Sequence, residues 1–88
     1  TLTLKPTNAG SFTMDVAASK IITNNQVTAT SRIVLADKNG AAAALQIGVK
    51  RLYEDPASRI AGVSFTVKTA NSTAAAGTEV FEYLLFNV

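Results

Sequence analysis

Few side chains in this chain could do chemistry, and the sequence contains neither His nor Cys. An ordinary nucleophile–base pair, a thiolate and an imidazole metal ligand are therefore excluded, which leaves carboxylates, Lys, Ser and Thr as candidate groups. Glu79 and Glu82 lie three residues apart, so on a strand they point to opposite faces. Glu54-Asp55 precedes Pro56, where acidic residues are typical of turns. We expect no enzymatic activity, metal, cofactor or small-molecule substrate.

The basic residues indicate a different chemistry, the binding of a polyanion. Lys68 shares one face of a predicted strand with Ser64 and Thr66 by period two. Hydroxyl groups and Lys bind phosphate and ribose, and a Tyr ring stacks on a base. The candidate nucleic-acid-binding residues are Gln46, Lys50, Ser64, Thr66, Lys68 and Tyr83. The same alternation is typical of a sheet face that contacts only solvent, and a net charge of +2 is weak. On the residues alone, solvent is the favoured interpretation.

Two alternating runs must position most of these residues. Leu45 to Lys50 and Val63 to Lys68 flank Glu54-Asp55-Pro56-Ala57-Ser58. Period two on either side of a turn predicts a long β-hairpin. The alternation assigns one set of side chains to a buried layer: Leu45, Ile47, Val49, Val63, Phe65 and Val67.

The segment before this hairpin has two interpretations. Asn39-Gly40 is typical of a type I′ turn, which predicts that Lys38 pairs with Ala41 and that Leu35 lies opposite Ala44. Residues 41–53 also fit an amphipathic helix. The strand is favoured, because Gly48 costs about 1 kcal/mol inside a helix and the following alternation is strict.

The remaining segments are predicted to be strands and turns. Leu2 to Lys5 and Phe12 to Val16 form an N-terminal hairpin around a turn at Thr7 to Gly10. Further strands are expected at residues 20–23, 27–36 and 79–88, and Ala70 to Gly77 is expected to be a long loop. The last strand is apolar on both faces and must be covered on both. About six strands with short connections predict an all-β chain, with residues 1–88 forming a single domain built on one antiparallel sheet or meander.

Size and composition favour self-association. A chain of 88 residues buries only about 60–65% of its unfolded surface, and without Cys or His it has neither disulfides nor a structural zinc site. Its 48% hydrophobic content exceeds what a small monomer needs, so we expect a homo-oligomer that completes the sheet. No apolar run approaches the length of a membrane span, and the start TLTLKPTNAG lacks the pattern of a secretory signal.

Four stretches carry a resemblance to a known family: LTLKPTNAGSFTM, ALQIGVKRLYEDPASRIAGVSFTVKT, ANSTAAAG and EVFEYLLFNV. In this order they resemble the coat proteins of the single-stranded RNA bacteriophages. The resemblance implies a sheet that lines the interior of a shell and binds an RNA hairpin as a dimer. It also implies a location in the virion, after assembly in the host cytoplasm. The implied RNA-facing positions are Gln46, Gly48, Ser64, Thr66, Lys68, Tyr83 and Leu85.

The sequence therefore predicts a self-assembling structural subunit, with a viral coat protein as the leading hypothesis. A small nucleic-acid-binding or polyanion-binding β module is the second hypothesis. An extracellular fibre or pilus subunit is the third, and an enzyme is the last.

Overall fold

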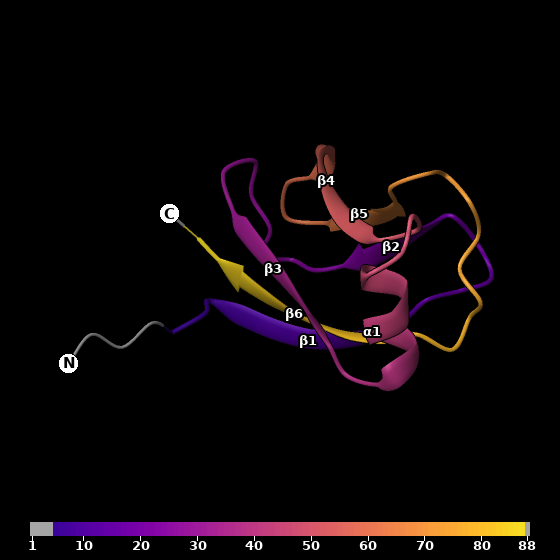
Figure 1. Ribbon diagram of the computed structural model, residues 1–88. Coiled ribbons are helices and arrows are strands. Elements are labelled where there is room, and N and C mark those ends of the chain that lie inside the picture. Colours follow the sequence, from indigo (N-terminus) through magenta and orange to yellow (C-terminus); the bar gives the residue numbers. More distant parts are fainter. Residues whose placement is uncertain (1–4, 88) are drawn as a thin grey trace.

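The fold is known from a computed structural model, which describes residues 5–87 and consists mainly of β-strands (Figure 1). The elements follow in the order β1 (Asn8–Thr13), β2 (Ser19–Thr23), β3 (Arg32–Asp37), α1 (Gly40–Gln46), β4 (Leu52–Ile60), β5 (Ser64–Thr69) and β6 (Val80–Phe86). The prediction of an all-β chain with antiparallel pairing is confirmed.

The strands form two sheets rather than one. One three-stranded sheet has the order β1-β6-β3 and the other the order β2-β5-β4. The prediction of a single six-stranded sheet or meander is wrong, because the last strand lies between the first and the third instead of extending the sheet at its end. The inner face of each sheet carries its buried side chains, and two facing sheets bury these inner faces without a partner chain.

The core lies between these two faces and contains several aromatic rings. Phe12 and Phe81 stack with ring centroids 5.6 Å apart within the first sheet. Phe65 of the second sheet meets Tyr83 of the first edge to face at 5.1 Å. Phe65 and Phe81 are fully buried, and burying such a side chain stabilises a fold by roughly 1.5–3 kcal/mol.

The segment after β3 is a helix, so the favoured strand and its type I′ turn are wrong. Asn39 has φ −149°, not a positive value, and its Oδ1 accepts a hydrogen bond from the N–H of Ala42 at 2.9 Å. It is therefore the N-cap of α1. The four Ala residues that follow Gly40 have the highest helix propensity. Ala42 and Leu45 are buried; Ile47 and Val49, predicted to be buried, are among the exposed apolar residues.

The predicted hairpin exists, but its turn lies later in the chain. β4 pairs with β5 around Ala61 to Val63, where Gly62 has φ +74°. The predicted turn at residues 54–58 is instead an irregular part of β4, where the register shifts between Asp55 and Ile60. Asp55 stabilises this irregular segment, because its Oδ1 accepts a hydrogen bond from the N–H of Ala57 at 3.1 Å. A bulge of this kind also accommodates a proline within a strand.

The N-terminal segment differs from its prediction in the same way. Residues 1–4 of the predicted first hairpin lie outside the described residues. The predicted turn at Thr7 to Gly10 largely belongs to β1, which pairs with β6. Gly10 allows this pairing because it has no side chain. A Cβ atom at this position would lie 2.7 Å from the hydroxyl oxygen of Tyr83, which is too close.

The remaining predicted segments agree better with the structure. β2 matches the strand expected at 20–23, and β6 matches the expected last strand. The segment Ala70 to Gly77 is a loop, as predicted, whereas the strand expected at 27–36 is shortened to β3.

Candidate functional site

The predicted nucleic-acid-binding residues fall on three separate parts of the molecule. Ser64, Thr66 and Lys68 lie in β5, the central strand of the second sheet. Gln46 and Lys50 lie at and beyond the end of α1, and Tyr83 lies in β6 of the other sheet. The structure therefore does not bring the six residues together on one face.

The alternation predicted for β5 is confirmed. Phe65 and Val67 are fully buried, while Thr66 and Lys68 are partly exposed on the opposite side. Ser64 shares that outer side but is only 5% exposed, so its hydroxyl has little access to a ligand. Of the three predicted residues in β5, only Thr66 and Lys68 offer appreciable surface.

The charge of Lys68 is engaged within the chain. Its Nζ lies 2.7 Å from Oδ2 of Asp55 on the neighbouring strand β4. The hydrogen bond with Asp55 raises the pKa of Lys68, and the hydrogen bond from Lys68 lowers the pKa of Asp55. Both groups are therefore charged at neutral pH and neutralise each other. No local pattern indicates this pair, because the predicted turn placed Asp55 outside the strands.

Gln46 and Lys50 have structural contacts. Oε1 of Gln46 accepts a hydrogen bond from the N–H of Leu52, which joins the end of α1 to the start of β4. Nζ of Lys50 donates to the carbonyl oxygen of Ala74 at 3.2 Å, across to the loop before β6. Both side chains fix connections between elements.

Tyr83 lies in the interior, where it cannot stack on a base. The residue is 6% exposed, and its hydroxyl oxygen accepts a hydrogen bond from Nδ2 of Asn24 at 3.1 Å. Nδ2 of Asn24 also donates to Oδ1 of Asn8 at 3.0 Å. Leu85, another position implied by the resemblance, is fully buried. The position of Tyr83 was unexpected because a strand with apolar residues on both sides does not reveal which side is the interior.

A buried ion pair is the most strongly charged feature of the interior. Nη2 of Arg59 lies 2.8 Å from Oε1 of Glu54, and Nε lies 2.9 Å from Oε2. The two side chains are 7% and 5% exposed, respectively. Nη1 of Arg59 donates to the carbonyl oxygens of Thr28 and Ala29, each at 3.2 Å. The guanidinium thereby ties the loop before β3 to β4, and its hydrogen bonding with Glu54 raises its pKa.

Glu79 is a second buried carboxylate, and it organises the end of the loop before β6. The residue is 4% exposed and accepts hydrogen bonds from the N–H groups of Ala76, Gly77 and Thr78 at 2.9, 3.0 and 3.2 Å. Burial acts to raise the pKa of Glu79, but the backbone N–H groups outweigh burial and hold this pKa below its ordinary value. Its role in the described structure is to close a loop.

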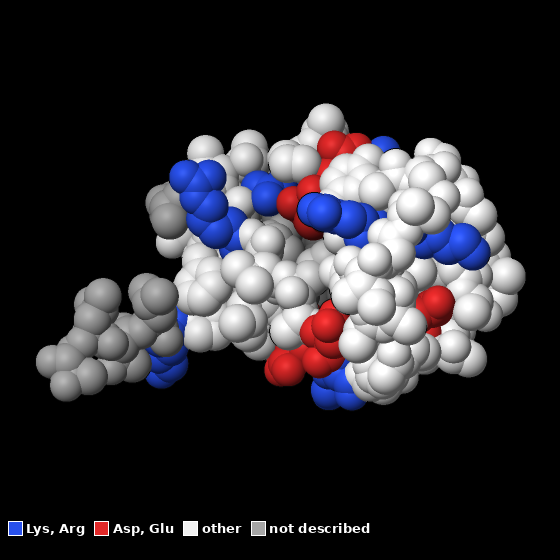
Figure 2. All heavy atoms as spheres, in the orientation of Figure 1, with Lys and Arg blue, Asp and Glu red and all other residues white. Residues whose placement is uncertain are grey.

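On the face drawn in Figure 2, the charges of the described residues do not form a continuous basic area. Figure 2 shows Lys and Arg atoms separated from one another by uncharged atoms and interspersed with Asp and Glu on the visible face. Lys68, Arg59 and Lys20 each lie within ion-pair distance of an acidic side chain. The visible face of the described residues therefore lacks the clustered positive charge with which proteins bind a nucleic-acid backbone.

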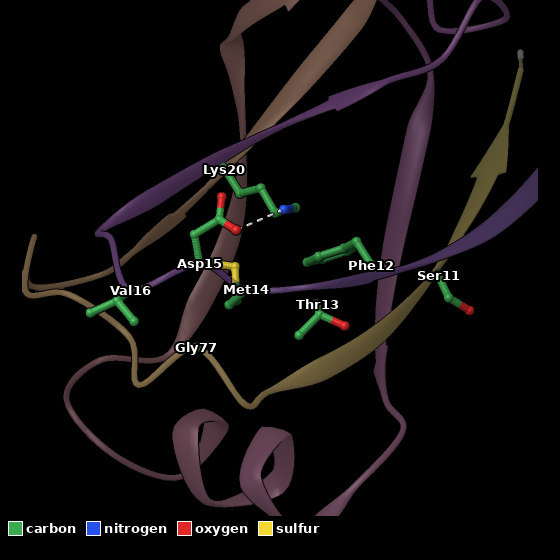
Figure 3. A pocket seen from close by; sticks show the side chains of 8 residues that line it. All are labelled: Ser11, Phe12, Thr13, Met14, Asp15, Val16, Lys20 and Gly77. Carbon is green, nitrogen blue, oxygen red and sulfur yellow. Dashed lines mark hydrogen bonds and ion pairs between the residues drawn. The ribbon is translucent and has the colours of Figure 1, made fainter.

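A shallow hollow of about 620 Å³ lies where β1 ends and β2 begins (Figure 3). The lining residues are Ser11, Phe12, Thr13, Met14, Asp15, Val16, Lys20 and Gly77. Nζ of Lys20 and Oδ1 of Asp15 lie 3.2 Å apart at the edge of the hollow. Each of these two charges therefore has the other as its partner.

Several large apolar side chains are exposed, including three of the six that the sequence assigns to the buried layer. The large apolar residues with exposed surface are Val16, Ile21, Val34, Ile47, Val49, Tyr53, Ile60 and Val63. They lie on strands of both sheets and on the connections between them. Three of them, Ile47, Val49 and Val63, had been predicted to face the core.

Comparisons with protein-family models, with characterised proteins and with solved structures find no match to this chain. Among residues 5–87, no group of three or more acidic side chains is arranged to hold a metal ion. The described part of the chain has no helix long and apolar enough to cross a membrane.

Proposed function

We propose that this chain is a structural subunit that assembles with copies of itself. The coat proteins of single-stranded RNA bacteriophages, which its order of elements resembles, are the proposed functional class. The proposed location is the virion, with assembly in the host cytoplasm. Binding of RNA by the six predicted residues is not part of this proposal, since they do not share a face.

The distribution of exposed apolar surface carries this proposal. Ile21 and Ile60, on the two edge strands of the second sheet, are 68% and 57% exposed, and Val34 on the first sheet is 49% exposed. Full burial of such a side chain is worth roughly 1.5–3 kcal/mol, and a partner would supply the part of this gain that corresponds to the surface still exposed. Apolar surface on several sides fits a subunit that contacts more than one neighbour, whereas a binding module concentrates it at one site.

The strand edges supply a second kind of contact. β1 and β3 lie at the edges of one sheet, and β2 and β4 lie at the edges of the other. An edge strand presents N–H and C=O groups that pair readily with a strand of another chain. Edges and apolar faces together give one small chain enough different surfaces to build an extended assembly.

Sedimentation velocity over a series from low micromolar to several hundred micromolar protein tests the proposal, with electron microscopy of the most concentrated sample. The expected result is mass action toward species larger than the monomer, ending in particles of regular shape. A folded monomer throughout the series would refute the proposed function. Filaments would favour a fibre subunit over a coat protein.

A further inference from the structure

The outer face of the first sheet carries an unbroken apolar row across its three strands. Ala9, Leu84 and Val34 are directly opposite one another in the antiparallel register, so all three side chains point to the same side. This side is the outer one, because the alternate residues Phe81, Tyr83 and Leu85 are buried in the core. Figure 1 shows β6 between β1 and β3, so Leu84 lies at the centre of the row.

The two rows beside it carry opposite charges. Arg32 is opposite Phe86 on one side of the apolar row, and Glu82 lies between Ala36 and Ser11 on the other side. Arg32 and Glu82 are therefore separated by four residues along the strands, about 14 Å, which is too far for an ion pair within one chain. Within residues 5–87, neither side chain lies within ion-pair distance of an opposite charge.

We propose that a second copy of this chain docks on this face, related by a two-fold axis that runs across the strands through the row of Leu84. This axis places Leu84 against the partner's Leu84 and reverses the strand direction, so the row of Arg32 lies over the partner's row of Glu82. Sheets that stack face to face lie about 10 Å apart, a distance that Arg and Glu side chains together can span. The dimer then contains two equivalent pairs, each between Arg32 of one copy and Glu82 of the other.

The charges distinguish this axis from the alternative one. A two-fold axis parallel to the strands would place Glu82 over the partner's Glu82, and like charges in contact oppose association. Lys38 also lies on this face, and its Nζ, which donates to Oγ of Ser11 at 3.1 Å, adds a positive charge to the row of Glu82. Of these two axes, only the one across the strands pairs Arg32 with the partner's Glu82, and its symmetry forms this pair twice.

The size of the face sets the strength expected of this contact. Three strands of about six residues cover roughly 15 Å by 20 Å, less than half of the about 800 Å² that each partner buries in a standard interface. We therefore expect a weak dimer, with a dissociation constant in the micromolar range or above. Weak contacts of this kind suit a subunit held by several neighbours. The inference rests on the proposed function and names one of its contacts.

The test uses two charge-reversed variants, R32E and E82R, alone and mixed. R32E has two acidic side chains at the paired positions, and E82R has two basic ones, so each variant repels itself. In the mixed dimer, both pairs are again attractive. We expect each variant alone to associate at least tenfold more weakly than the unmodified chain in sedimentation velocity. An equimolar mixture, and the double variant R32E/E82R, should recover association.

A matched control is R51E, which reverses an exposed Arg outside this face and should associate like the unmodified chain. Circular dichroism of all variants checks that they fold, which is expected since neither changed side chain is buried. If the unmodified chain associates and R32E and E82R associate equally well, or their mixture does not recover, the docking inference is refuted and the proposed function stands. If the unmodified chain is a monomer at every concentration, both are refuted.

Discussion

Replacing Glu54 with Gln should destabilise the fold strongly, because it leaves the guanidinium of Arg59 buried without a counter-charge. The two side chains are only 5% and 7% exposed, and they share two hydrogen bonds of 2.8 and 2.9 Å. Removing one partner of a buried ion pair costs about 3–5 kcal/mol. That is a large part of the about 5–15 kcal/mol that holds a typical domain folded.

Urea unfolding followed by circular dichroism measures the effect. The unfolding midpoints of the variants are compared at one low protein concentration, because association would raise the apparent stability of the folded chain. We expect the midpoint of E54Q to fall well below that of the unmodified chain. The matched control is D55N, which removes the charge of the neighbouring acid in the more exposed pair with Lys68, whose side chain is 39% exposed. Its effect should be much smaller.

A second variant separates the charge from the shape of the pair. E54L/R59M replaces both partners with apolar side chains, and such replacements of buried pairs are often close to neutral. Here it should be more stable than E54Q but less stable than the unmodified chain, because the carbonyl oxygens of Thr28 and Ala29 lose the hydrogen bonds from Arg59, and only that of Thr28 keeps another donor, the N–H of Ser31. If E54Q lowers the free energy of unfolding by less than about 1 kcal/mol, which is the effect expected for a solvent-exposed ion pair, the pair does not behave as a buried one and the reasoning is refuted.

Three further predictions concern single positions. The pKa of Glu79 is lowered on folding, so below the ordinary pKa of 4.5 the unfolded chain binds a proton that the folded chain does not. The stabilising contribution of Glu79 should therefore be complete above pH 4.5 and be lost as the pH falls through the lowered pKa. Urea midpoints at neutral and acidic pH should show that the stability of E79Q depends less on acid than that of the unmodified chain. G10A should destabilise by about 1–3 kcal/mol in urea unfolding, because its Cβ would lie within 2.8 Å of ring atoms of Tyr83; an unchanged midpoint would contradict the close approach. N39A should lose about 1 kcal/mol through the cap on the N–H of Ala42, whereas N39D should retain most of it; equal stability of the two variants would contradict the capping role.

Local sequence signals predicted the elements whose partners lie nearby or whose pattern is unambiguous. The alternation of Val63 to Lys68 correctly placed Phe65 and Val67 in the core and Lys68 on the opposite side. The apolar last strand and the small-residue loop before it were also predicted. These features depend on period two and on turn chemistry, which a short window of sequence contains.

The candidate site could be predicted less well, because its geometry depends on pairs distant in sequence. The hydroxyl of Tyr83 bonds Asn24, 59 residues away, and no local pattern shows that this ring faces the core. Lys68 meets Asp55 only because the hairpin turn lies at Gly62 rather than at Pro56. An irregular strand and a turn share the same residue types, so the sequence did not distinguish them.

By itself, the sequence determined the class of the fold, because short runs in which apolar and polar residues alternate favour strands with one buried side. Only the tertiary structure decided that these strands form two sheets with β6 between β1 and β3, and that Asn39 caps a helix instead of turning a hairpin. The physical reason is that strand pairing and the covering of both faces are decided between residues far apart in sequence. The free energy gained by burying apolar side chains depends on the whole chain. At these positions it is larger than the local preference of a few residues for one backbone conformation over another.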